Sequence, residues 1–106
     1  MKLLFESANP ENWKNAIIKR SKEGQQETWN ILEHNRIQYL RHTGNVGNKG
    51  VVQLSINTLN NTLIAEIVKF EGIEDNVEDF EGYILGRFCE IVFVNFNDEF
   101  TNIKKS

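Results

Sequence analysis

Six carboxylates are crowded into one short stretch of the chain that contains no Lys or Arg. The acids are Glu71, Glu74, Asp75, Glu78, Asp79 and Glu81, and Phe80 stands among them with Ile73 and Val77. Uncompensated carboxylates with apolar neighbours suit a basic partner protein, because electrostatic attraction speeds the encounter while apolar contact buries surface. The alternative is a solvated loop that leads into the acidic first turn of a helix. The six acids and Phe80 are therefore the candidate partner-binding residues.

The chain offers little for metal or phosphate binding. The acids do not have the spacing of an EF-hand calcium loop, and one cysteine with two histidines cannot form a zinc site without carboxylates. The loop that contains Gly44, Gly47, Lys49 and Gly50 lacks the spacing of a P-loop and follows an expected strand instead of opening a helix. The sequence predicts no metal and no other cofactor.

Two histidines and one cysteine are the candidates for catalysis. His34 and His42 could act as acid and base on a phosphodiester, but the expected hairpin places them at its two ends, at ~3.3 Å per residue. Cys89 could be a nucleophile only beside a base, and its neighbours Phe88 and Ile91 favour a core position. We therefore expect no enzyme; the alternative is a small ribonuclease that uses a histidine or a hydrolase that uses Cys89.

Composition limits the class of protein. A chain of 106 residues, with 40% hydrophobic and 25% charged residues, predicts one globular domain over residues 1–106. The net charge is −3, and outside the acidic stretch twelve Lys and Arg face nine acids. Basic residues form no stripe, so we expect no direct binding of nucleic acid. The short N-terminal apolar run, the lack of a span of ~20 apolar residues and the single cysteine predict no membrane segment and a cytoplasmic location.

The elements that must position these residues are centred on residues 51–70. Val52, Leu54 and Ile56 alternate with polar residues, which is typical of a strand with one buried face. A second β-branched run begins at Thr62, and the Asn residues between the two runs favour the positive φ angles of a hairpin turn. These residues predict a central antiparallel hairpin.

The N-terminal half predicts a helix and another hairpin. A short strand is expected from Lys2 to Glu6, and Asn9 with Pro10 is typical of a helix start, with Asn9 accepting a backbone hydrogen bond. The helix should run from Pro10 to about Glu23 and bury the face that carries Trp13, Ala16, Ile17 and Arg20. After it, alternation around Trp29 predicts a strand, with a turn at His34 and a partner strand from Arg36 to Thr43.

Two interpretations compete after the acidic stretch. Ile84 and Phe88 lie at helical spacing, whereas Gly82 and Gly86 and the run of strand formers from Ile91 to Val94 favour a strand. We expect a short helix over 77–88, a strand over 90–96 and an edge strand over 99–104. The whole chain then predicts an α+β fold, an antiparallel sheet of about five or six strands with the N-terminal helix packed on one face and a possible second short helix.

In size, acidity and absence of catalytic motifs, the chain resembles the small acidic cytoplasmic antitoxins that neutralise secreted bacterial toxins, especially nucleases. The resemblance implies an immunity protein that binds a basic toxin nuclease domain stoichiometrically and blocks its active site. A nuclease presents cations to phosphates, so an acidic protein surface can occupy the same site. A homo-oligomeric accessory protein is the third alternative, and the sequence leaves the oligomeric state open.

Overall fold

The computed structural model describes residues 2–23, 28–44, 50–69 and 80–106. In chain order the elements are β1 (Lys2–Glu6), α1 (Pro10–Lys22), β2 (Trp29–His34), β3 (Ile37–His42), β4 (Val51–Asn57), β5 (Thr62–Val68), α2 (Glu81–Asn95), a 3₁₀ turn (Asn97–Glu99) and β6 (Asn102–Lys105). The described part therefore has two α-helices and a six-stranded antiparallel sheet, which confirms the predicted α+β class.

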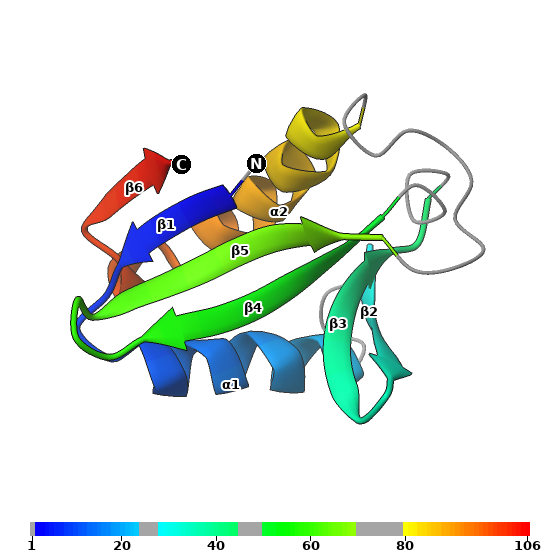
Figure 1. Cartoon of the computed structure of the whole chain (residues 1–106), viewed down its shortest axis with the longest axis horizontal. Helices are drawn as coiled ribbons and strands as arrows, with labels where there is room; N and C mark the ends of the chain where they lie inside the picture. Colours follow the sequence, from blue (N-terminus) through cyan, green and yellow to red (C-terminus); the bar gives the residue numbers. More distant parts are fainter. Residues whose placement is uncertain (1, 24–27, 45–49, 70–79) are drawn as a thin grey trace.

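The strands lie in the order β2-β3-β4-β5-β1-β6 (Figure 1). The β4–β5 hairpin occupies the middle of the sheet and pairs continuously from Val51–Val68 to Asn57–Thr62, as predicted. The first strand, β1, lies between β5 and β6, so the two ends of the chain meet at one side of the sheet. Asn61, in the turn between β4 and β5, has a φ of 49°, the positive value that the Asn residues predicted.

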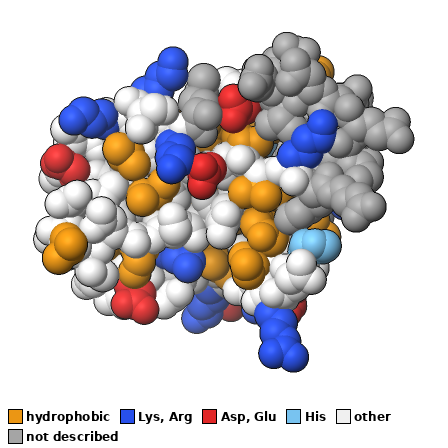
Figure 2. Space-filling view, viewed as in Figure 1, with side chains coloured by type: hydrophobic (Ala, Val, Ile, Leu, Met, Phe, Trp, Pro, Cys, Tyr) orange, Lys and Arg blue, Asp and Glu red, His pale blue; other side chains and the backbone are white. Residues whose placement is uncertain are grey.

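Both helices pack on the same face of the sheet. Side chains that alternate along the strands, such as Phe5, Leu63 and Ala65, point to this face and contact the helices in one core. The buried core comprises Phe5, Trp13, Ile17, Trp29, Leu40, Val52, Leu54, Leu63, Ala65, Ile67, Ile84, Leu85, Phe88, Val92 and Phe96. The opposite face carries no described helix and mixes hydrophobic side chains with charged ones (Figure 2).

Aromatic rings join the helices to β1 and to the segment before β6. Phe5 of β1 makes edge-to-face contacts with Trp13 of α1 and Phe88 of α2, with ring centroids 5.5 and 6.1 Å apart. Trp13 also stacks on Phe100 at 5.6 Å, which holds the segment before β6 against α1. Such arrangements add about 0.5–1.5 kcal/mol per pair beyond the burial of area. The aromatic cluster therefore fixes α1, α2 and β1 relative to one another.

Helix α1 confirms the prediction, with one difference at its start. Pro10 is the first helical residue, and Trp13 and Ile17 are buried. However, Asn9 makes no side-chain capping hydrogen bond; its own N–H donates instead to Ser7 Oγ at 3.3 Å. The first turn of α1 is thus held by Pro10 and by burial instead of an Asn cap.

The strand expected over 90–96 is wrong, because α2 continues without a break from Glu81 to Asn95. Ile84, Leu85, Phe88 and Val92 recur at helical spacing and are all buried, so helix formation places four side chains in the core. This burial outweighs the strand propensity of the Ile91–Val94 run, since tertiary packing routinely overrides local propensity. The following strand, β6, begins at Asn102, later than expected, because Asn97–Glu99 form a 3₁₀ turn.

Candidate functional site

Of the seven predicted partner-binding residues, two lie within the described structure and five lie outside it. Glu71, Glu74, Asp75, Glu78 and Asp79 lie outside the described residues. Phe80 immediately precedes α2 and packs, partly buried, against the core, while Glu81 is the first residue of the helix. The acidic stretch therefore leads directly into the N-terminus of α2. A partner attracted by the acidic residues would lie close to the exposed side of this helix.

The side of α2 that faces away from the core is unusually apolar. Tyr83 and Phe93 are each 51% exposed and Val94 is 79% exposed, whereas a solvated helix face is normally polar. Arg87 and Glu90 lie between them along the helix. We call the face formed by these five residues the outer face of α2. Three of its members, Tyr83, Arg87 and Phe93, are of residue types that are enriched in protein interfaces.

Two glycines adjoin the outer face of α2. A Cβ atom added at Gly82 or Gly86 would meet nothing within 4 Å, so no close packing in the described structure requires either glycine. Each glycine inside a helix costs about 1 kcal/mol relative to alanine. The helix thus keeps a flat surface near Tyr83 at a cost in its own stability.

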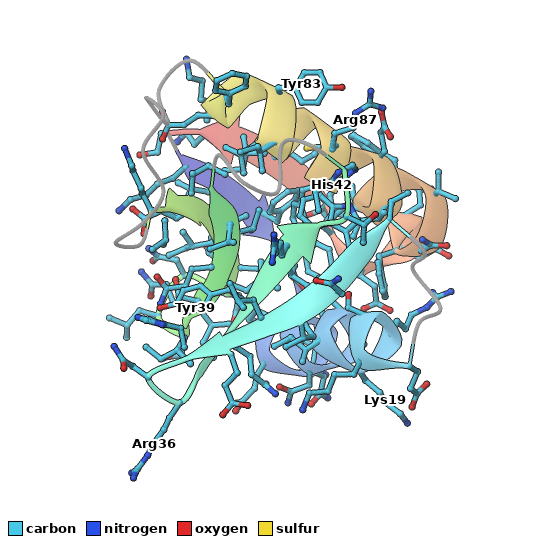
Figure 3. All side chains as sticks on the ribbon, turned by 90° about the vertical axis from the view of Figure 1, so that its right-hand side faces the viewer. Lys19, Arg36, Tyr39, His42, Tyr83 and Arg87 are labelled. Atoms are coloured by element: carbon cyan, nitrogen blue, oxygen red, sulfur yellow. The ribbon has the colours of Figure 1, made fainter. Side chains whose placement is uncertain are left out.

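A pocket of about 340 Å³ lies beside the outer face, between α2 and the end of the β2–β3 hairpin. Its lining is Thr28, Trp29, His42, Gly44, Tyr83, Arg87 and Glu90. Figure 3 shows His42 at the end of β3, close to Tyr83 and Arg87 of α2. The tertiary structure therefore brings His42 of β3 next to three polar side chains of α2, Tyr83, Arg87 and Glu90.

Arg87 organises the pocket side chains. One terminal nitrogen donates to Glu90 Oε1 at 2.9 Å and the other to Tyr83 Oη at 2.9 Å. The guanidinium carbon also lies 5.0 Å from the centroid of the Tyr83 ring, within the range of a cation–π contact. The hydrogen bond with Tyr83 and the charge of Glu90 raise the pKa of Arg87, so this side chain is cationic at every accessible pH.

His42 is held as a neutral imidazole. Its Nδ1 accepts a hydrogen bond of 3.0 Å from the Gly44 N–H, so the proton of the neutral ring lies on Nε2. The edge of the ring packs against Trp29, with centroids 5.1 Å apart. Partial burial and the positive charge of Arg87 lower the pKa of His42. The pocket therefore offers an Nε2–H donor together with the guanidinium of Arg87.

The two histidines do not come together. In the β2–β3 ladder His42 pairs with Trp29 and His34 pairs with Ile37, so they occupy opposite ends of the hairpin, as the sequence predicted. The sequence did not predict that His42 lines one pocket with residues of α2. Tyr83, Arg87 and Glu90 recur at helical spacing, and this signal would have been found if residues 90–95 had been interpreted as helix.

Cys89 is half-buried and packs against the core, which agrees with the interpretation of a core cysteine. Burial raises the pKa of its thiol, so the nucleophilic thiolate is scarce at neutral pH. Within the described ranges, no group of three or more His, Cys, Asp or Glu side chains is arranged to hold a metal ion. None of the described helices is both long and apolar enough to cross a bilayer.

Comparison with other proteins adds no family to these observations. No family model, no curated protein and no solved structure matches the chain. The outer face of α2 and the adjoining pocket thus have to be interpreted from their own chemistry.

Proposed function

We propose that the protein is a small protein-binding module, an immunity or antitoxin protein that inhibits a basic nuclease toxin by stoichiometric binding. The observation that carries the proposal is the outer face of α2, where Tyr83, Phe93 and Val94 are exposed. A partner that covers such a helix face removes apolar surface from water, which stabilises the complex by about 25 cal/mol per Å² of apolar surface buried.

The charge distribution supports a basic partner. The described residues include eleven Lys and Arg and nine Asp and Glu, so the acidity of the chain is concentrated in the residues that lead into α2. In this proposal the acidic stretch attracts and orients a cationic partner, and the outer face of α2 supplies the apolar contact. A nuclease has the required cations at its active site, and inhibition inside the producing cell would place the protein in the cytoplasm.

The test uses a nuclease toxin domain, which the proposal expects the gene beside that of this protein to encode. We expect a one-to-one complex by calorimetry and loss of the toxin's nuclease activity. Val94→Lys combined with Phe93→Gln should weaken binding at least about tenfold, since central apolar contacts dominate interface energies. Leu59→Lys is the matched control, because Leu59 is 93% exposed in the β4–β5 turn, far along the chain from α2.

Charge provides an independent part of the test. Reversing Glu74, Asp75, Glu78 and Asp79 to Lys should slow association and weaken its salt dependence, because steering by exposed charges acts mainly on the association rate. If the charge-reversed protein and the Val94→Lys, Phe93→Gln protein both bind and inhibit the toxin as the unchanged protein does, the proposal is wrong.

A hydrolytic enzyme is the second candidate, favoured by the pocket that brings His42 to Arg87, Tyr83 and Glu90. A cation that can hold a phosphate beside a proton-carrying imidazole is a combination that can cleave a phosphodiester. His42→Gln distinguishes the two candidates. A binding protein should keep its inhibitory effect in this variant, whereas a loss of the biological effect with unchanged thermal unfolding would favour the enzyme.

A further inference from the structure

The six-stranded sheet is open in its interior. Among the described residues, β3 and β4 pair only at Leu40–Val52, whereas β2 and β3 pair at six positions and β4 and β5 at seven. Figure 1 shows the reason: the β2–β3 hairpin turns away from β4 beyond this single pair. The described edge of β4 from Gln53 to Asn57 therefore has no ladder with β3.

A groove of about 500 Å³ fills this opening, which we call the β3–β4 seam. It is lined by Lys14 and Ile18 of α1, Glu33, Arg36, Ile37 and Gln38 of the β2–β3 hairpin, and Gln53, Leu54 and Ser55 of β4. Helix α1 thus closes the seam on the core side, while the mouth opens toward solvent beside Ile37, which is 42% exposed. The lining includes no residue of α2.

The backbone along the seam favours an extended ligand. In a strand, alternate residues direct their N–H and C=O groups to the same side, so one set of β4 groups pairs with β5 and the other set faces the seam, where no ladder with β3 is present beyond Val52. An unpaired strand edge is a template for another extended chain. Peptide segments bind other proteins in this way, with main-chain hydrogen bonds supplying affinity and side-chain pockets supplying selectivity.

The charge of the lining favours an acidic ligand, because Lys14 and Arg36 outnumber Glu33. Arg36 also has a φ of 68° in the turn between β2 and β3, next to Asn35 at 51°. Hairpin turns with two positive φ angles prefer glycine at the second position, since a side chain there is strained. The turn thus holds an arginine where glycine would be more stable, and Figure 3 shows this exposed side chain at the tip of the hairpin, directed away from the strands.

We propose that the β3–β4 seam binds an extended segment of a partner protein, which adds as a strand to β4 and places a carboxylate side chain beside Lys14, where the exposed side chain of Arg36 can turn toward it. The unpaired edge selects an extended backbone, and the two cations select the acidic side chain. This site is separate from the outer face of α2 and does not depend on the function proposed above.

The probe is the capped peptide Val-Thr-Val-Asp-Val-Thr, titrated into the isotope-labelled protein. We expect the amide resonances of residues 37–39 and 53–57 to shift and the exchange of the β4 amides to slow. Replacing Asp by Lys in the peptide should weaken binding about tenfold or more, the loss expected for one charge-assisted hydrogen bond. Replacing the Val before Asp by Pro should abolish binding, because Pro removes a backbone donor.

Protein variants complete the test. Lys14→Glu should weaken binding of the Asp peptide at least about tenfold, while Lys19→Glu, the same charge change elsewhere on α1, should not. Arg36→Gly should raise the thermal unfolding temperature and yet weaken peptide binding, a combination that a purely structural role of Arg36 does not produce. Phe93→Gln should leave peptide binding intact. The proposal is overturned if the Asp peptide at millimolar concentration leaves the seam amides unmoved, or if Lys14→Glu binds it normally.

Discussion

The protonation of His42 depends on contacts that cross from the sheet to α2. Its Nδ1 is occupied by the Gly44 N–H, and Trp29 covers the edge of the ring. Partial burial, followed by the charge of Arg87, disfavours the imidazolium and lowers the pKa of His42, whereas Glu90 opposes this effect. An imidazole with a lowered pKa couples the protonation of one side chain to the stability of the whole fold.

The lowered pKa predicts a loss of stability in weak acid. As the pH falls below about 6.5, the ordinary value, the unfolded chain binds a proton at His42 before the folded protein does, so the free energy of unfolding decreases. Urea unfolding between about pH 7 and pH 5 should show this dependence, and His42→Gln should reduce its slope. Equal slopes for His42→Gln and the unchanged protein would remove His42 as the cause.

At the scale of elements, α2 is longer at its C-terminal end than sequence propensity predicts. Its exposed surface is also the basis of the proposed function. Its inner face follows the rule that buried apolar residues recur at helical spacing, through Ile84, Phe88 and Val92. Its outer face departs from the rule, with exposed apolar side chains and two glycines that the described packing does not require. Residues that break such local rules are expected at surfaces that serve function instead of folding.

Substitution of two glycines by alanine should change the stability of the protein in opposite directions. Gly86→Ala should stabilise the protein by about 1 kcal/mol, because the methyl group enters open space and alanine favours the helix. Gly50→Ala should destabilise it by about 1–3 kcal/mol, because the new Cβ would lie 3.0 Å from Ile67 Cγ2 in a buried site. Urea denaturation measures both changes. A destabilised Gly86→Ala protein would mean that this glycine has an internal structural role after all.

At the scale of the whole molecule, one core joins the sheet and both helices. Phe5 has no exposed surface and contacts aromatic rings of α1, α2 and the segment before β6. Both β1 and the residues after α2 depend on this core, although they lie at opposite ends of the sequence. The protein should therefore unfold as one cooperative unit, as single domains of this size usually do.

Phe5→Ala should reduce the free energy of unfolding by about 3–5 kcal/mol, because it removes a fully buried ring from this core. Phe93→Ala deletes the same ring from the half-exposed outer face, where it contacts Phe100, and should cost less, no more than about 2 kcal/mol. Chemical denaturation followed by fluorescence and by circular dichroism would measure both losses. Similar losses for the two variants, or transitions that differ between the two probes, would argue against a single core centred on Phe5.

Much of the fold could be predicted from local patterns. The alternation of Val52, Leu54 and Ile56 and the start at Pro10 predict a hairpin and a helix that the structure confirms. The candidate site was less predictable. The carboxylates from Glu71 to Asp79 lie outside the described residues, and the pocket at His42 depends on contacts with α2, 41–48 positions further along the chain. No local period in the sequence encodes a contact over that separation.

By itself, the sequence determined the α+β class, the β4–β5 hairpin, helix α1 and the concentration of negative charge before α2, because backbone periodicity and charge are properties of neighbouring residues. Only the tertiary structure decided that residues 90–95 are helical, that His42 lies beside Arg87, and that the sheet opens between β3 and β4. Each of these outcomes depends on which apolar faces cover one another. Burial in a shared core is a property of residues distant in the chain, and there it outweighed the strand propensity of Ile91–Val94.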